Sequence, residues 1–308
     1  MPHRTDSLKS FIVLIQALGL LLAIVGSFFG GLYLFNGSIL FALPLSLLLV
    51  VAMFRLVTYF MKEKQELRRK GYPPMFYVLF CLYGLLGIVL SFLVLHFVNV
   101  EFFEKNEIKS NARIKLDGLE KIYQEYNQEY ENFCSVLSSD IILRTSTQDL
   151  VDANRSVLNG APYNLDDNTL KIIFKRPDRV GAINDIKIQP MKDDFKATEL
   201  ALMSNKNEFF SSSLLVIDEW SRLKIAKVFN DIHRRVANDY LELNNKLISK
   251  SSNRVQLITN QQSLLQNSLI DKPFQLAIKH LGLTTVIVLI VFQLLILLPY
   301  FLTKGRQY

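Results

Sequence analysis

The chain has 308 residues, of which 50% are hydrophobic and 20% charged, and its net charge is +7. Residues 101–280 contain equal numbers of basic and acidic side chains, so the positive excess lies in the rest of the chain. The basic residues of that remainder flank long apolar runs, and this arrangement is typical of a membrane protein, where it marks the orientation of the spans. We therefore exclude nucleic acid as a partner and expect membrane lipid around part of the chain.

Four apolar runs cover residues 11–35, 39–61, 75–99 and 281–303. Each reaches the length of about 20 residues that a helix needs to cross a hydrocarbon layer of about 30 Å. The runs are apolar on nearly every side, whereas a soluble core helix would keep a polar stripe. The first run is too long for the apolar part of a signal peptide, and a second run follows at once. We predict an all-α membrane protein with four transmembrane helices.

A basic connector at residues 62–74 separates the second run from the third. Short loops rich in Lys and Arg mark the cytoplasmic side of a membrane, and this loop contains Lys62, Lys64, Arg68, Arg69 and Lys70. Residues 1–61 are then a cytoplasmic N-terminus and a transmembrane hairpin, and residues 304–308 are a cytoplasmic tail. Residues 100–280 are predicted to be extracytoplasmic, although the cations at 105–115 oppose this orientation.

Small and ionisable residues within the runs indicate how the spans are used. Gly26 and Gly30 form a GxxxG pattern, which lets another helix backbone approach closely, and we expect that helix to belong to the same subunit. No acidic residue lies inside the predicted spans, Arg55 can reach the cytoplasmic surface, and His96 is near the outer end of the third span. Ion-coupled transport is therefore disfavoured.

Residues 100–280 begin with a heptad pattern and return with a second one. The first contains Leu116, Leu119, Tyr123, Tyr126, Tyr130 and Phe133, and the second contains Ile225, Phe229, Ile232 and Val236. Such spacing is typical of helices that pair along an apolar seam. We predict two long antiparallel helices that form a coiled-coil-like stalk, and we interpret the tyrosines as seam residues rather than as a ligand site.

Residues 165–190 have a different residue pattern from the two heptad segments. Residues 169–175 and 182–189 are short candidate strands bounded by Asp, Asn and Pro, and they predict a small β-hairpin at the distal end. Its turn region contains Lys171, Lys175, Arg176 and Arg179, which are possible distal contacts. A lone hairpin is marginal in water, so it would pack on the helices or on a partner.

Catalytic and metal-binding patterns are not found. The four histidines are scattered, and none forms a pair at metal-ligand spacing. Asp231 and His233 are interpreted as surface residues of a mixed-charge helix, and Trp220 as a packing residue. We predict that the protein is not an enzyme and takes no cofactor.

The two cysteines bear on the compartment. Cys81 lies in the third run and Cys134 in the large domain, so no internal disulfide can form in that domain. This favours a bacterial inner membrane with a periplasmic domain, although residues 154–156 would be a glycosylation acceptor in a eukaryote. The layout is similar to that of tetraspanins, but the cysteine pattern of their large loop is missing, so the family is not assigned.

Two classes of function remain. The first is a membrane scaffold, sensor or coupling subunit whose helical stalk binds other envelope proteins, as a homo-oligomer or as part of a hetero-complex. The alternative is an oligomeric channel or an accessory subunit of a transport or export machine. The neutral domain and the two seams favour the first class.

Overall fold

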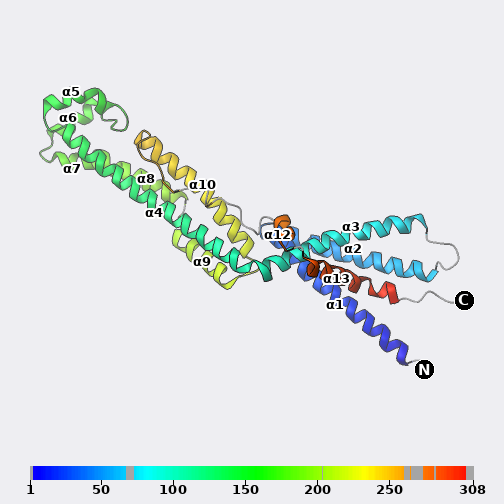
Figure 1. The fold of residues 1–308 in the computed structure, drawn as a ribbon. Helices are drawn as coiled ribbons and strands as arrows, with labels where there is room; N and C mark the ends of the chain where they lie inside the picture. The colour runs from blue at the N-terminus through cyan, green and yellow to red at the C-terminus, as the bar shows by residue number, and fades with distance from the viewer. Residues whose placement is uncertain are drawn as a thin grey trace. The chain divides into compact units, whose positions relative to one another are not determined.

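The structure is a computed structural model that describes residues 3–66, 73–202, 204–259, 264, 273–280 and 282–302. Within these residues every regular element is a helix and no strand occurs (Figure 1). The chain divides into two compact units. Unit 1 contains Met1–Ala112, Val216–Asn230 and Asn267–Tyr308, and unit 2 contains Arg113–Leu215 and Asp231–Gln266. The all-α prediction is confirmed for the described part of the chain.

Four helices of unit 1 are long and apolar enough to cross a membrane. They are α1 (His3–Leu34), α2 (Ile39–Glu66), α3 (Pro74–Val98) and α13 (Leu283–Leu302). α1 packs against the other three, and the buried cluster between the spans includes Met53, Phe60, Leu90 and Ile296. Other apolar side chains point outward: Leu40 is 84% exposed and Ile88 is 68% exposed. A surface of this kind suits lipid, and the chain is a multi-pass membrane protein.

Gly26 and Gly30 lie where α1 approaches α3. A Cβ on Gly30 would lie 2.0 Å from the carbonyl oxygen of Leu93, and one on Gly26 would lie 3.0 Å from Cγ2 of Val94. The first distance is shorter than any side chain tolerates against a fixed backbone. The GxxxG face of α1 therefore packs against a helix of the same chain.

The turn between α1 and α2 uses left-handed backbone. Asn36 has φ of 52° and Gly37 has φ of 81°. The N–H of Gly37 donates to the carbonyl oxygen of Leu32 at 2.8 Å, which is typical of a helix that ends in a left-handed cap. The two helices can thus reverse direction over four residues.

The start of α1 and the ends of α2 and α13 lie at one end of the bundle (Figure 1). Lys64 Nζ donates to the carbonyl oxygens of Tyr300, at 2.7 Å, and Phe301, at 3.3 Å. The last carbonyls of a helix lack intrahelical partners, so this ammonium group caps α13. Lys62 is exposed. The other three topology residues, Arg68, Arg69 and Lys70, lie outside the described residues.

The third apolar helix continues beyond its predicted end. A π-helical turn, η1 (Asn99–Phe103), follows α3, and the apolar span covers Pro74–Phe103. This span contains Glu101, which the sequence analysis assigned to the extramembrane domain. Glu101 thus lies near the end of the candidate span and beyond the predicted run at 75–99, which itself contains no acidic residue.

Unit 2 is built around parts of α4 (Lys105–Arg144) and α10 (Ile225–Ser251), together with α8 (Gln189–Leu202). The six seam residues of α4 are all buried, as are Ile232 and Val236 on α10. The rings of Tyr126 and Tyr130 pack against Phe195 of α8, with ring centres 6.1 and 5.3 Å apart. The seam of α4 therefore contacts α8 as well as α10.

The predicted β-hairpin is wrong. Residues 169–175 lie in α6 (Asp167–Lys175), and residues 182–189 pass through α7 (Arg179–Ile183), the π-helical turn η2 (Asn184–Ile188) and the first residue of α8. Helix α5 (Gln148–Asn159) precedes them. The carboxylates of Asp166 and Asp178 accept hydrogen bonds from the N–H groups of Thr169, at 2.7 Å, and Gly181, at 2.9 Å. Aspartate in this position starts a helix, so Asp166, which was expected to bound a strand, is an N-cap, and Asp178 is another.

Candidate functional site

A buried carboxylate lies at the end of the third span. The side chain of Glu101 is 3% exposed. It accepts hydrogen bonds from the Tyr33 hydroxyl at 2.9 Å, from Trp220 Nε1 at 2.9 Å and from Arg222 Nε at 2.6 Å. Tyr33 belongs to α1, whereas Trp220 and Arg222 lie between α9 (Lys206–Glu219) and α10. These four residues, all in unit 1, are named the Glu101 cluster.

Two local features of the backbone assemble the cluster. The wider π-helical turn η1 holds Glu101, and its hydrogen bond runs from the N–H of Glu104 to the carbonyl oxygen of Asn99 at 2.9 Å. Trp220 has φ of 53°, a left-handed conformation that is uncommon for a large residue. It ends α9 and brings the indole and the Arg222 guanidinium to the same carboxylate.

The hydrogen bonds of the cluster occupy both oxygens of Glu101. Arg222 donates to Oε1, and Tyr33 and Trp220 donate to Oε2. A buried charge is stable only when it is paired and hydrogen-bonded, and removing one partner is costly. Glu101 therefore joins α1, η1 and the 220–222 turn, and it presents no free oxygen to a substrate or a metal ion.

Glu104 forms a second buried pair one turn later. Its side chain is 4% exposed, and its carboxylate lies 2.7 Å from Lys279 Nζ and 2.5 Å from His280 Nε2. Lys279 ends α12 (Pro273–Lys279). Burial raises the pKa of Glu104, but the hydrogen bonds from Lys279 and His280 outweigh it, so the pKa lies below its usual value. The contact ties α12 to the residues that follow η1.

Two buried polar side chains before Glu101 have unpaired atoms within the described residues. His96 is 1% exposed, and neither ring nitrogen has a hydrogen-bond partner. Asn99 is fully buried, and its Nδ2 donates to the carbonyl oxygen of Leu276 at 3.2 Å while Oδ1 is unpaired. The His96 ring meets the edge of Tyr33, with ring centres 6.3 Å apart. Such groups are uncommon in folded proteins, and they adjoin the Glu101 cluster.

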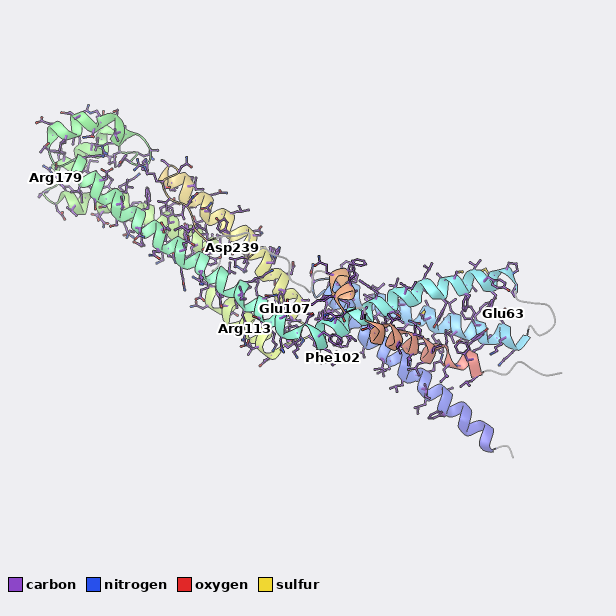
Figure 2. All side chains as sticks on the ribbon, in the orientation of Figure 1. Glu63, Phe102, Glu107, Arg113, Arg179 and Asp239 are labelled. Atoms are coloured by element: carbon purple, nitrogen blue, oxygen red, sulfur yellow. The ribbon has the colours of Figure 1, made fainter. Side chains whose placement is uncertain are left out.

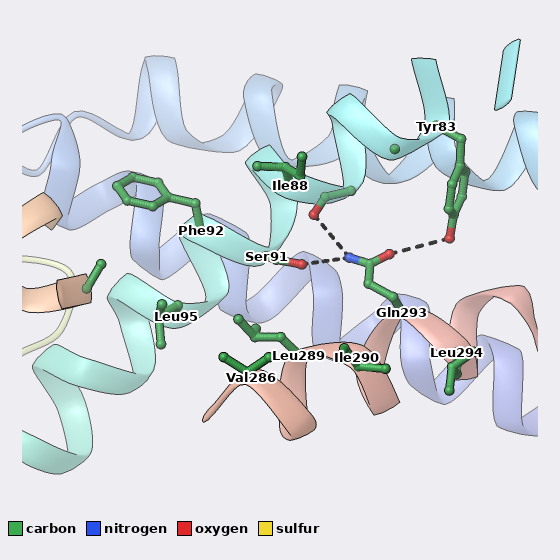
Figure 3. Close-up of a pocket in the computed structure, with 13 residues that line it drawn as sticks. Tyr83, Ile88, Ser91, Phe92, Leu95, Val286, Leu289, Ile290, Gln293 and Leu294 are labelled. Atoms are coloured by element: carbon green, nitrogen blue, oxygen red, sulfur yellow. Dashed lines mark hydrogen bonds between the residues drawn. The ribbon is translucent and has the colours of Figure 1, made fainter. Parts of the chain in front are cut away.

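A cavity of about 500 Å³ lies between α3 and α13 in the membrane-spanning part of unit 1 (Figure 3). Most of its lining is apolar, including Ile88, Phe92, Val286 and Ile290. Its polar groups are linked through Gln293, whose Nε2 donates to the Gly87 carbonyl oxygen at 3.1 Å and to Ser91 Oγ at 2.8 Å, while its Oε1 accepts from the Tyr83 hydroxyl at 3.4 Å. These bonds join two spans and satisfy the half-buried amide.

Unit 2 contains a buried acid with fewer partners. Asp239 accepts a hydrogen bond from the Tyr123 hydroxyl at 2.6 Å, and Arg235 Nη1 lies 3.9 Å away. Burial raises the pKa of Asp239, and the Tyr123 hydrogen bond and the Arg235 charge offset only part of this rise. The neighbouring Tyr126 hydroxyl donates to the carbonyl oxygen of Phe195 at 3.0 Å. The seam tyrosines therefore supply polar contacts as well as apolar packing.

The four candidate distal contacts lie on or beside α6 and α7 rather than in a hairpin turn: Lys171, Lys175, Arg176 and Arg179. Arg179 Nη1 donates to the carbonyl oxygens of Thr145, at 3.3 Å, and Ser146, at 2.8 Å, and thereby closes the turn after α4 (Figure 2). Arg176 pairs with Asp185 at 3.3 Å. Lys171 and Lys175 are exposed. Two of the four cations thus have structural partners.

Sequence reasoning missed the Glu101 cluster. The apolar pattern resumes at Phe102 and Phe103 after Glu101, and aromatic residues are typical of a membrane interface, so a longer third span was detectable. The partners were not, because Trp220 and Arg222 lie 119 and 121 residues from Glu101 in the sequence. No local pattern connects positions so far apart.

Within the described residues no group of three or more His, Cys, Asp and Glu side chains is arranged to hold a metal ion. Cys81 is exposed, Cys134 is buried, and both are free. Burial raises the pKa of the Cys134 thiol to about 11, so this thiol is neutral at physiological pH. Comparison of the chain with protein-family models, with curated proteins and with solved structures found no match in any of the three.

Proposed function

We propose that the protein is a non-enzymatic membrane scaffold or coupling subunit whose extramembrane helical domain binds other envelope proteins. The Glu101 cluster carries this proposal. An acidic residue in an apolar span usually points to transport chemistry, but both oxygens of Glu101 are occupied by donors from α1 and the 220–222 turn. A carboxylate held in this way braces the chain and is poorly suited to carry protons.

The proposal includes a location for the protein. Residues 100–280 form a stalk in the periplasm of a bacterium, and four spans anchor it in the inner membrane. The basic residues Lys62 and Lys64 at the end of α2 support a cytoplasmic face at that end of the bundle. The equal numbers of acidic and basic side chains in residues 101–280 fit an aqueous compartment on the other side.

The proposed partner surface is a strip of exposed, uncharged residues on α4, named the α4 strip: Asn132, Ser135, Val136, Ser139 and Leu143. Val136 and Leu143 are each 68% exposed, although both are large and apolar. Their spacing of seven places them two turns apart on the same side of the helix. Two large apolar side chains exposed on one side of a helix, with no charged residue in the strip between them, support the choice of this surface.

Site-specific crosslinking in native membranes tests this proposal. A photo-reactive amino acid at Val136 should give discrete crosslinked partners, whereas the same probe at the exposed Lys196 of α8 should not. Adding Leu143→Asp should abolish the Val136 crosslinks while the variant stays folded, because Leu143 is exposed. Identical crosslinks at both probe positions, or none at Val136, would refute the α4 strip. Leu119 and Tyr126 are unsuitable for this purpose, because both are completely buried.

The second candidate is a channel or an accessory subunit of a transport machine. It is favoured by the cavity between α3 and α13, where Tyr83, Ser91 and Gln293 place polar groups within the membrane part (Figure 3). Purified protein in liposomes should then pass small solutes without partners, and Gln293→Leu should change the flux. Liposomes that remain impermeable would leave the scaffold proposal as the better account.

A further inference from the structure

A second cavity, in unit 2, has a mixed polar and apolar lining that comes from separate parts of the chain. Its volume is about 390 Å³. The lining includes Asn164 before α6, Thr169 on α6, Lys187 on η2, Asp194 on α8 and Lys250 on α10. Small-molecule sites have volumes of about 300–1,000 Å³. This cavity, named the lysine pocket, lies at the lower end of that range and can hold only a small ligand.

The charges at the lysine pocket do not balance. The carboxylate of Asp194 accepts from Lys246 Nζ through Oδ1 and from Lys250 Nζ through Oδ2, both at 2.8 Å. One negative charge thus already serves two ammonium groups. Lys246 lies outside the lining, whereas Lys187 lines the cavity beside Lys250 and adds a third positive charge to the group; it has no carboxylate or hydrogen-bond partner among the described residues. Other nearby acids are engaged, because Asp166 caps α6 and Glu131 pairs with Lys192.

The surroundings of Lys187 are unfavourable for an ammonium ion. Burial lowers the pKa of Lys187, and the positive charge of Lys250 lowers it further. Cys134 lies near Lys187, but its buried thiol is neutral and does not supply a counter-charge. An anion between Lys187 and Lys250 would remove the repulsion between them. The fold therefore holds two cations beside a cavity where a small anion would stabilise both.

From this arrangement we infer that the lysine pocket binds a phosphate-type dianion, as inorganic phosphate or as a small phosphomonoester. Three ammonium groups against one carboxylate leave an excess that a dianion matches, and phosphate offers several strong acceptor oxygens. Lysine binds phosphate well as a compact charge. The Asn164 amide and the Thr169 hydroxyl line the same cavity and can donate to the remaining oxygens. This inference is independent of the proposed scaffold function.

Binding can be measured on the full chain in detergent micelles by equilibrium dialysis with radiolabelled inorganic phosphate at constant ionic strength. We expect saturable binding of one phosphate per chain. Lys187→Gln should weaken it at least about tenfold, because a charge-assisted hydrogen bond is lost. The matched control is Lys171→Gln, which removes an exposed lysine outside this cavity and should leave binding unchanged. Absence of saturable binding, or equal binding by wild type and Lys187→Gln, would overturn the inference.

Two further measurements test which anion is bound and whether a loss of binding is due to unfolding. Competition by glycerol 3-phosphate at lower concentration than inorganic phosphate would support a phosphomonoester, whereas equal competition by acetate would refute the phosphate assignment. Lys187→Glu should abolish binding but should fold with an unchanged or higher melting temperature, because it exchanges repulsion from Lys250 for attraction. Retained phosphate binding by this variant would contradict the site.

Discussion

The two units hold their buried acids in different ways. In unit 1 the side chains of Glu101 and Glu104 are 3% and 4% exposed, and each has a cationic partner within 2.7 Å. In unit 2 the side chain of Asp239 is 8% exposed, and its cation, Arg235, is 3.9 Å away. The pKa of Glu104 is lowered by its partners, whereas the pKa of Asp239 is raised by burial. Two acids with little solvent exposure thus titrate in opposite directions, because Asp239 lies deeper in the protein and its cation is farther away.

This difference shows what decides whether a buried acid stabilises a fold. Burial penalises the charged form, and only close donors with positive charge reverse that penalty. A tyrosine hydroxyl and a distant guanidinium are insufficient at Asp239. At neutral pH the acids of unit 1 should therefore stabilise the fold by linking its helices. Ionised Asp239 should instead destabilise the fold, although its hydrogen bond positions Tyr123.

The largest effect is expected for Glu101→Ala. It leaves the donors of Tyr33, Trp220 and Arg222 without their shared acceptor, and removing one partner of a buried pair costs about 3–5 kcal/mol of the free energy of unfolding. Trp220 is the single tryptophan of the chain, so its fluorescence during denaturation reports directly on this cluster. Glu107→Ala is the control, because Glu107 is 53% exposed and should matter little. Similar losses in both variants would contradict the special role of Glu101.

A smaller effect is expected from the two seam tyrosines. Tyr123→Phe removes the close donor of a buried carboxylate and should cost about 1–3 kcal/mol, whereas Tyr126→Phe leaves a neutral carbonyl unpaired and should cost about 1 kcal/mol. Hydrogen exchange of peptides from α8 and α10 measures both changes within unit 2. A larger loss of stability in Tyr126→Phe than in Tyr123→Phe would contradict the expected difference between a carboxylate acceptor and a carbonyl acceptor.

The pH dependence of Asp239 has a defined sign. Its pKa is higher in the folded state than in the unfolded state, where an Asp has a pKa of about 3.9. The folded state therefore binds the proton more tightly, and stability falls as pH rises from that value through the raised pKa. Asp239→Asn should remove this loss and be equal to wild type or more stable at neutral pH. Urea denaturation of both proteins between pH 4 and pH 7 (roughly the window of carboxyl titration) measures the difference in stability. If wild type became more stable relative to the variant as pH rises, the pKa of Asp239 would be lowered rather than raised.

Glu104 should show the opposite sign with the smallest amplitude. Its lowered pKa gives stability that is present above the unfolded value of about 4.3 and is lost as pH falls through the folded pKa. Lys279→Gln should reduce this acid-side loss, and added salt should reduce it in wild type because Lys279 is 49% exposed. Denaturation monitored through Trp220 at acidic and neutral pH tests both statements. An unchanged acid-side loss in Lys279→Gln would show that the lowered pKa of Glu104 depends on its other partners, His280 and Glu107.

Local sequence patterns were a sound guide where the environment acts on every residue of a segment. A backbone in hydrocarbon must satisfy its own hydrogen bonds, so a long apolar run predicts a helix without knowledge of its neighbours. The heptad pattern likewise selects Leu116, Leu119 and Tyr123, which are buried in unit 2. It did not reveal that α8 shares this seam, because the pattern marks an apolar face and carries no information about which helix covers it.

The hairpin error has a different origin. Residues 169–175 and 182–189 are short, and short apolar runs do not distinguish a strand from a buried helix. Asp166 and Asp178 each precede a helix and accept a backbone N–H three residues later. Both aspartates are visible in the sequence as possible N-caps, so the helices that follow them could have been predicted from local sequence.

The sequence by itself determined four apolar spans, a basic connector and two apolar seams, because each depends on composition or on spacing within one segment. Only the tertiary structure decided which acids acquire partners. Glu101 meets Trp220 from 119 residues away, and the lysine pocket combines Asn164, Lys187 and Lys250 from separate helices and loops. Hydrogen bonds and charge pairs act over a few ångströms, so they depend on where packing places each side chain, and that placement is not encoded in any local repeat.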